Sequence, residues 1–131
     1  MERRTINPWQ WQAQLGYAQS IEVTAGQHVL YCAGQTATNA SGQPQHPGNM
    51  GAQLMAALDN LEVVLTSAGY RLADLVRLNY YTTDIDAFFA NYAAVVRRLT
   101  TADCLPSGTL LGVSRLARPE LLVEVEGTAV R

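Results

Sequence analysis

Apolar and polar residues alternate along Glu120–Ala129, the last strand-length segment of the chain. Val123 and Val125 point to one side of an extended chain, whereas Glu124 and Glu126 point to the other. A solvated outer face of a β-sheet explains this pattern. A carboxylate placed in a cleft for acid–base chemistry explains it as well. The alternation alone leaves both interpretations open.

Five other segments have the length and residue content of β-strands. They are Glu2–Pro8, Tyr17–Thr24, His28–Ala33, Leu75–Thr82 and Pro106–Leu116. Ala25-Gly26-Gln27 is a turn signal between two of these segments. The segment beginning at His28 is apolar on both faces, which predicts a strand that is covered on both sides.

Two segments show the spacing of three and four residues that is typical of amphipathic helices. The first begins at about Asn49, which fits an N-cap, and ends before Gly69, which fits the C′ position. Its apolar stripe comprises Met50, Leu54, Ala57, Leu58, Leu61, Val64, Leu65 and Ala68. The second helix begins after Thr83-Asp84, and we interpret Arg97-Arg98 near its end as structural cations that suit the helix dipole.

The predicted order of elements is β-β-β-α-β-α-β-β, in one α+β domain that spans residues 1–131. Two helices cover only one face of such a sheet. The other face is expected to include Leu30 or Tyr31, Leu110 or Leu111, and Leu122. A large apolar face is normally buried by association, so we expect a closed symmetric oligomer with clefts between subunits as natural small-molecule pockets.

Composition narrows the possible functions. The net charge of −2 gives no electrostatic footprint for nucleic acid or an anionic membrane. All nine basic residues are arginine, which excludes a lysine Schiff base. No apolar run reaches transmembrane length and no hydrophobic signal core follows the N-terminus, so we expect a cytoplasmic protein.

Candidate ligands and nucleophiles are few. His28, His46, Cys32 and Cys104 make no recognisable zinc spacing, and no Gly-rich phosphate loop occurs, so we expect neither a metal nor a cofactor. Cys104 is either a nucleophile or, as we favour, an inert buried thiol.

Two tryptophans stand close together near the N-terminus. Trp9 and Trp11 either anchor the entry segment or form an aromatic pocket wall.

Several stretches together resemble the reactive intermediate deaminase (Rid) family, also called YjgF or L-PSP endoribonuclease-like proteins. They are Tyr31–Thr36, Gln53–Leu61, Ala68-Gly69, Asp74–Val76, Thr83-Asp84, Pro106 and Leu121–Ala129. The resemblance covers essentially the whole chain, in matching order and spacing. It implies a chorismate-mutase-like mixed sheet with two helices on one face, and a homotrimer with an inner barrel and three intersubunit clefts.

The resemblance also implies a chemistry. The deaminase branch of this family hydrolyses reactive enamines and imines, such as 2-aminoacrylate, that are formed by PLP enzymes. Glu124 matches the glutamate that positions or activates the hydrolytic water, and Tyr17 matches a pocket tyrosine. Gly34 and Asn91 match positions whose backbone lines the cleft, the latter across a one-residue gap.

One departure affects the expected substrate. Deaminases of this family carry an arginine two residues after the proline, and its guanidinium grips the substrate carboxylate. Here Pro106-Ser107-Gly108 has glycine in that place, which deletes an interaction worth about 1.5–3 kcal/mol. The chain therefore resembles an arginine-lacking branch, whose pocket is expected to admit a bulkier or uncharged substrate.

Backbone amides at Gly108, Thr109 and Leu110 are expected to line the site and to stabilise developing negative charge. A non-catalytic small-molecule-binding trimer is the alternative to an imine or enamine hydrolase. Endoribonuclease activity ranks last, because the chain has no basic stripe and no catalytic histidine pair.

Overall fold

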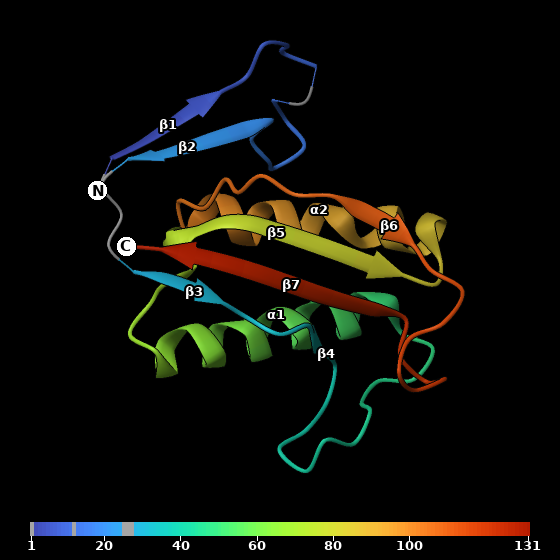
Figure 1. Cartoon of the computed structure of the whole chain (residues 1–131). Coiled ribbons are helices and arrows are strands. Elements are labelled where there is room, and N and C mark those ends of the chain that lie inside the picture. The colour runs from blue at the N-terminus through green and yellow to red at the C-terminus, as the bar shows by residue number, and fades with distance from the viewer. Residues whose placement is uncertain (1, 12, 25–27) are drawn as a thin grey trace.

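The computed structural model describes residues 2–11, 13–24 and 28–131, which form a mixed sheet, two helices and a separate hairpin (Figure 1). The sheet contains β3 (Val29–Tyr31), β4 (Gln35–Thr36), β5 (Leu75–Thr82), β6 (Leu110–Gly112) and β7 (Val123–Val130). The helices are α1 (Met50–Ser67), α2 (Ile85–Thr101) and the short 3-10 helix η1 (Leu72–Asp74). The hairpin consists of β1 (Glu2–Ile6) and β2 (Ser20–Thr24).

Strand β7 lies at the centre of the main sheet, whose order is β3-β7-β5-β6. β5 runs parallel to β6 and antiparallel to β7, so the two C-terminal segments flank β5 and do not pair with each other. The segment between β3 and α1 contributes the two-residue strand β4, which also pairs with β7. The sheet is therefore mixed, as predicted.

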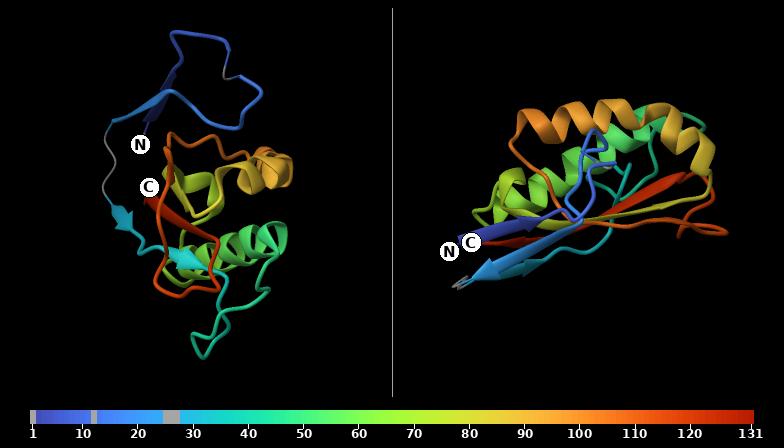
Figure 2. Two further views of the ribbon diagram at one scale, coloured as in Figure 1. Left: turned by 90° about the vertical axis from the view of Figure 1, so that its right-hand side faces the viewer. Right: turned by 90° about the horizontal axis from the view of Figure 1, so that it is seen from above.

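The N-terminal hairpin stands apart from the main sheet (Figure 2, left). β2 pairs with β1, whereas β3 pairs with β7. The predicted turn at residues 25–27 lies outside the described part of the chain. The Arg3 guanidinium fastens the hairpin to the sheet by donating to the carbonyl oxygens of Asp74 at 2.8 Å and Val130 at 2.9 Å.

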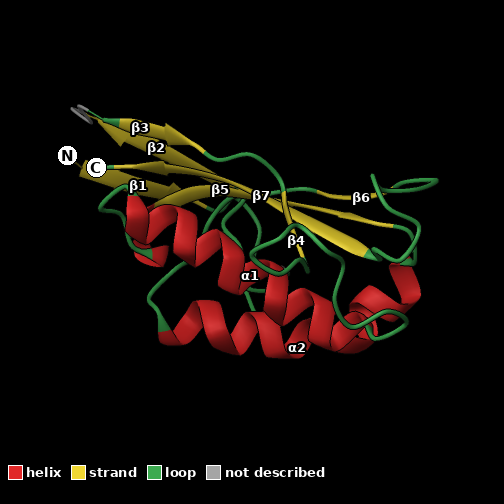
Figure 3. Cartoon of the chain, turned by 90° about the horizontal axis from the view of Figure 1, so that it is seen from below, coloured by secondary structure: helices red, strands yellow, loops and turns green. Residues whose placement is uncertain are grey.

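Both helices cover the same face of the sheet (Figure 3). The predicted caps of α1 are confirmed, because the Asn49 side chain accepts a hydrogen bond from the Ala52 amide and Gly69 adopts a φ of +81°. Asp84 caps α2 by accepting from the Ala87 amide. None of the helices in the described residues combines the length and hydropathy needed to cross a membrane.

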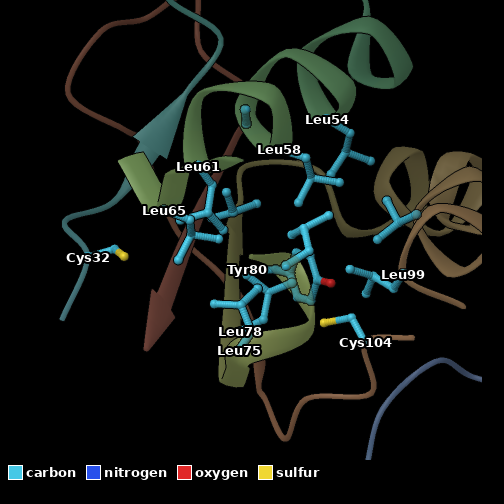
Figure 4. Packing of buried hydrophobic residues seen from close by; sticks show 14 of the residues in the cluster. Cys32, Leu54, Leu58, Leu61, Leu65, Leu75, Leu78, Tyr80, Leu99 and Cys104 are labelled. Atoms are coloured by element: carbon cyan, nitrogen blue, oxygen red, sulfur yellow. The ribbon is translucent and has the colours of Figure 1, made fainter. Parts of the chain in front are cut away.

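The hydrophobic core lies between the helices and the sheet (Figure 4). Leucines of α1 meet leucines and a tyrosine of β5 there. The labelled members are Leu54, Leu58, Leu61 and Leu65 from α1, and Leu75, Leu78 and Tyr80 from β5. Cys32 and Cys104 lie at opposite ends of this group, and both are free thiols.

The face of the sheet that the helices leave open is more polar than the sequence analysis expects. Of the predicted apolar residues, Tyr31 and Leu111 are on this face, whereas Leu30, Leu110 and Leu122 pack against the core. The prediction for Leu122 was therefore wrong. The open face carries mostly polar side chains from β5 and β7: Arg77, Asn79, Tyr81, Glu124, Glu126 and Thr128.

Within this chain β3 is covered on one side, so its cover on both sides stays a prediction that depends on association with another copy. Tyr31 is 80% exposed, and Val29 is exposed too. β3 is an edge strand with helices on one side only, so alternate side chains face away from the core.

Candidate functional site

Glu124 is on the open face of the central strand β7, opposite Tyr81 of β5 and Thr36 of β4. Its carboxylate lies directly against the backbone of Gly34, where a Cβ atom would overlap Glu124 Oε1. Glycine at this position therefore lets the carboxylate approach the chain just before β4. The structure thus brings together two of the residues that the sequence predicts for the site.

The environment of the Glu124 carboxyl favours its protonated form. Partial burial raises the pKa of this carboxyl, and the neighbouring Glu126 carboxylate raises it further. A carboxylate with a raised pKa is a stronger base than an ordinary glutamate, which suits a general-base role. The alternation of Val123 and Val125 inward with Glu124 and Glu126 outward is confirmed, since both valines are fully buried.

Glu126 is held in place by its neighbours on β5. Its Oε1 accepts hydrogen bonds from the Tyr81 hydroxyl at 2.9 Å and from Asn79 Nδ2 at 3.3 Å. The hydrogen bond to Glu126 raises the pKa of Tyr81, so this phenol remains a donor. Glu126 thus belongs to a hydrogen-bonded cluster, whereas no ion pair or hydrogen bond engages the Glu124 side chain within the described residues.

A second group of predicted residues lies on the helix side of the sheet. Tyr17, Gly108, Thr109 and Leu110 line a cavity of about 760 Å³ between the hairpin loop, α2 and the strands β5 and β6. The volume is in the range of small-molecule sites. Within one protomer, Leu110 and Glu124 lie on opposite sides of the sheet, since Leu110 pairs with Tyr80, which lines the cavity, whereas Tyr81 beside Glu124 is on the open face. The Thr109 side chain contacts Arg77 of the open face although this residue also lines the cavity.

Gly108 occupies a tight place in the wall of this cavity. A Cβ atom at residue 108 would overlap the Leu78 carbonyl oxygen of β5. Ser107 and Thr109 on either side accept backbone hydrogen bonds from Leu78 and Tyr80, which hold the segment against β5. Glycine here therefore permits close packing of two backbones, and it does not enlarge the pocket as the sequence analysis expects.

The amide of Thr109 is already engaged. It donates to Asn79 Oδ1 at 3.1 Å, and the Thr109 hydroxyl lies 3.1 Å from Arg77 Nη2. In this arrangement the Thr109 amide already has an acceptor, so it is not free to stabilise developing negative charge as expected from the sequence.

Asn91 lies apart from both groups. Its Nδ2 donates to the Ala87 carbonyl oxygen within α2 at 2.8 Å, and its Oδ1 faces Gly51 of α1. The structure places it at the contact between the two helices, and it is not among the residues that line the cavity.

Sequence reasoning missed the aromatic character of the cavity. Phe88, Phe89 and Tyr92 of α2 line it together with Tyr80 of β5. The amphipathic spacing of α2 predicts a face that packs in the core. Part of this face lines the cavity because α2 packs against β5 beside the loop between β1 and β2.

Trp11 also lines the cavity, which supports the pocket-wall interpretation for this tryptophan. Trp9 is 62% exposed and anchors nothing in the core.

Cys104 is the candidate nucleophile, and groups of His, Cys, Asp and Glu side chains are the candidate metal ligands. Burial raises the pKa of Cys104 to about 12, so its thiol is protonated and inert at neutral pH. In the described part of the chain, no three His, Cys, Asp or Glu side chains gather in a way that could hold a metal ion.

Comparisons with known proteins agree on one family. The family described as Endoribonuclease L-PSP matches residues 10–131. The crystal structure of the Rid-family protein YyfB from Yersinia pestis is 34% identical, and the match covers all of both chains with a TM-score of 0.90. The YjgF structure from E. coli is 27% identical, with a TM-score of 0.70 over 88% of this chain and 87% of its own. These similarities confirm the predicted YjgF-like fold.

A curated relative carries an enzymatic name. The 2-iminobutanoate/2-iminopropanoate deaminase of Escherichia coli (strain K12) is 24% identical over 116 residues, which are 88% of this chain and 87% of that protein.

Proposed function

This chain belongs to the Endoribonuclease L-PSP family, which includes the Rid and YjgF proteins, and from that membership we propose that it hydrolyses a reactive imine or enamine in a cleft between subunits of a homotrimer. The observation that carries the proposal is the Glu124 carboxyl, whose pKa is raised and whose side chain lies against Gly34. The deaminase name of the E. coli relative supports the same reaction class.

The proposed reaction uses one water molecule. Glu124 accepts a proton from the water as its oxygen attacks the carbon of the C=N bond, which gives a tetrahedral carbinolamine. Starting from the protonated imine, the carboxyl returns its proton to the carbinolamine nitrogen, the C–N bond breaks as Glu124 takes the proton of the hydroxyl, and that proton passes to the released ammonia. The products are a carbonyl compound and ammonium, and Glu124 is ionised again. Each step needs only a carboxyl group that can gain and lose a proton near neutral pH.

The shared cleft follows from the positions of the two groups of site residues. Glu124 and Gly34 are on the open face of the sheet, whereas the cavity lined by Tyr17, Gly108 and Leu110 is on the helix side. A substrate meets both groups only if a second copy supplies one of them. The exposed Tyr31 and Leu111 give the open face apolar contacts for such an association.

The test is hydrolysis of 2-iminopropanoate and of an imine without a carboxylate, each generated in situ and followed by semicarbazide trapping. We expect wild-type protein to accelerate imine hydrolysis, and Glu124→Ala to lose about 10²–10⁴-fold of that rate while keeping its oligomeric state. Glu120→Ala, an exposed glutamate before β7, is the control. Equal rates for Glu124→Ala and wild type would remove Glu124 from the mechanism, and a monomer in light scattering would exclude the shared cleft.

A non-catalytic small-molecule-binding trimer is the alternative. The missing arginine at Gly108 favours it, because the usual grip on the substrate carboxylate is lost. Binding of small ligands without any imine turnover would support this alternative.

A further inference from the structure

The helix-side cavity has an aromatic wall and a single charged group. The rings of Tyr80, Phe88 and Tyr92 are packed edge-to-face or tilted, with centroids 5.2–5.9 Å apart. Trp11 approaches from the hairpin loop. Among the described residues that line the cavity, Arg97 of α2 is the only charged one, and none is acidic.

Arg97 differs from its neighbour Arg98 in its partners. Arg98 bridges to Asp59 at 2.7 Å and to Glu62 at 3.2 Å, and so joins α2 to α1. No carboxylate or hydrogen-bond partner is found for the Arg97 side chain within the described residues. The interpretation of both arginines as structural therefore fits Arg98, whereas Arg97 is an exposed arginine that is among the residues lining the aromatic cavity.

The loop between β1 and β2 is fixed beside this cavity by hydrogen bonds in its second half. The Tyr92 hydroxyl donates to the Leu15 carbonyl oxygen at 2.9 Å, and the Ala18 amide donates to the Pro106 carbonyl oxygen at 2.9 Å. The loop therefore forms a built wall opposite α2. A cavity with an apolar body and one unpaired cation at its edge is complementary to a ligand with an apolar body and one anionic group.

We propose that this cavity binds a carboxylate with an aromatic or bulky aliphatic body, and that Arg97 holds the carboxylate in place of the arginine absent at Gly108. Both residues line the same cavity. A guanidinium pairs with a carboxylate through two parallel hydrogen bonds, and the planar rings accept a flat apolar group. The inference rests on the proposed function in treating the cavity as part of the substrate site, and it names that substrate as a bulky apolar imino acid.

Two other ligand classes fit less well. A cationic ligand would stack on the aromatic rings, but Arg97 would repel it. A small imino acid such as 2-iminopropanoate would leave most of the 760 Å³ unfilled.

The test is calorimetric titration with 3-phenylpropanoate and with its neutral isostere 3-phenylpropanamide. We expect wild-type protein to bind the carboxylate about tenfold more tightly than the amide, as one charge-assisted interaction predicts. Arg97→Gln should abolish this preference, whereas Arg118→Gln, an exposed arginine outside the cavity, should retain it. Ala93→Trp, which places a large side chain into the cavity from an exposed helix position, should abolish binding of both probes.

Equal affinities for the two probes in wild type, or a preference that survives in Arg97→Gln, would overturn the proposal. A lack of binding of either probe at millimolar concentration would also overturn the proposal. If Trp11→Ala then changes the oligomeric state, the cavity is an interface between copies. Glu124→Ala should keep the preference for 3-phenylpropanoate over 3-phenylpropanamide, because Arg97 supplies that preference. Retained turnover in that variant with normal probe binding would refute the proposed reaction and leave the Arg97 site standing.

Discussion

The two sides of strand β5 carry different chemistry although they alternate residue by residue. Tyr80 faces the helices, and burial raises its pKa well above the usual range, so its phenol stays neutral among other rings. Tyr81 faces the open side and donates to Glu126 beside Glu124. One side is thus an aromatic cavity with a single cation, and the other is a polar face with paired carboxylates. The two kinds of side chain are therefore kept on opposite sides of one strand in the protomer.

Gly108 is the point where the cavity wall meets β5, and its substitution should have the largest effect on this arrangement. Gly108→Ala should lower the free energy of unfolding by about 2–3 kcal/mol, because overpacking against the Leu78 carbonyl forces a backbone shift. Urea unfolding followed by circular dichroism measures the loss.

Gly112→Ala is the matched control for this substitution. Its Cβ would meet only the Ile85 side chain, at 3.3 Å, which has room to adjust. Equal stability of the two variants would contradict the close packing at Gly108. Gly108→Arg carries the same overlap, so an arginine at this position is expected to require a change in the backbone.

The attachment of the loop between β1 and β2 concerns the cavity side alone, and weakening it should have a smaller effect than Gly108→Ala. Tyr92→Phe removes the hydrogen bond to the Leu15 carbonyl and should cost about 1 kcal/mol of loop docking. Hydrogen exchange measured by mass spectrometry should show faster exchange in the hairpin loop and unchanged exchange in β7. Tyr31→Phe, on the exposed edge strand, is the control; unchanged exchange in the Tyr92 variant would mean that other contacts hold the loop.

Local signals in the sequence predicted much of the fold. The helices were found with their caps at Asn49, Asp84 and Gly69, because periodicity and capping depend on residues close together in the chain. The edge position of β3 within this chain was not found, because an apolar run cannot reveal whether a strand is central or at an edge. The same limit hid the pairing of β2 with β1, which depends on distant segments.

The candidate site also has features that the sequence predicts and features that depend on contacts between distant segments. Alternation placed Glu124 outward, and the resemblance drew attention to Gly34, which the structure places against it. Neither predicted that Gly108 packs against the β5 backbone, since that contact joins segments thirty residues apart. Arg97 looked like its neighbour in sequence, and only the positions of Asp59 and Glu62 on α1 distinguish the paired arginine from the unpaired one.

The smallest expected effect concerns the charge of Glu124 itself. Its pKa is raised in the folded protein, so folding favours the protonated carboxyl. The stability that this proton contributes is fully present below the pKa of an unfolded glutamate and is lost as pH rises through the raised value. At neutral and alkaline pH the ionised carboxylate therefore destabilises the fold, by less than about 1 kcal/mol because the group is partly exposed.

Glu124→Gln removes this titration while keeping the shape of the side chain. The variant should be slightly more stable than wild type at pH 8, and the difference should shrink as pH falls toward 4. Thermal unfolding at pH 8, 6 and about 4 measures it, with Glu120→Gln as a control that shows no such trend. A variant less stable than wild type at pH 8 would mean that the carboxylate gains a partner in the assembled protein, and the open face would then contribute binding as well as proton transfer.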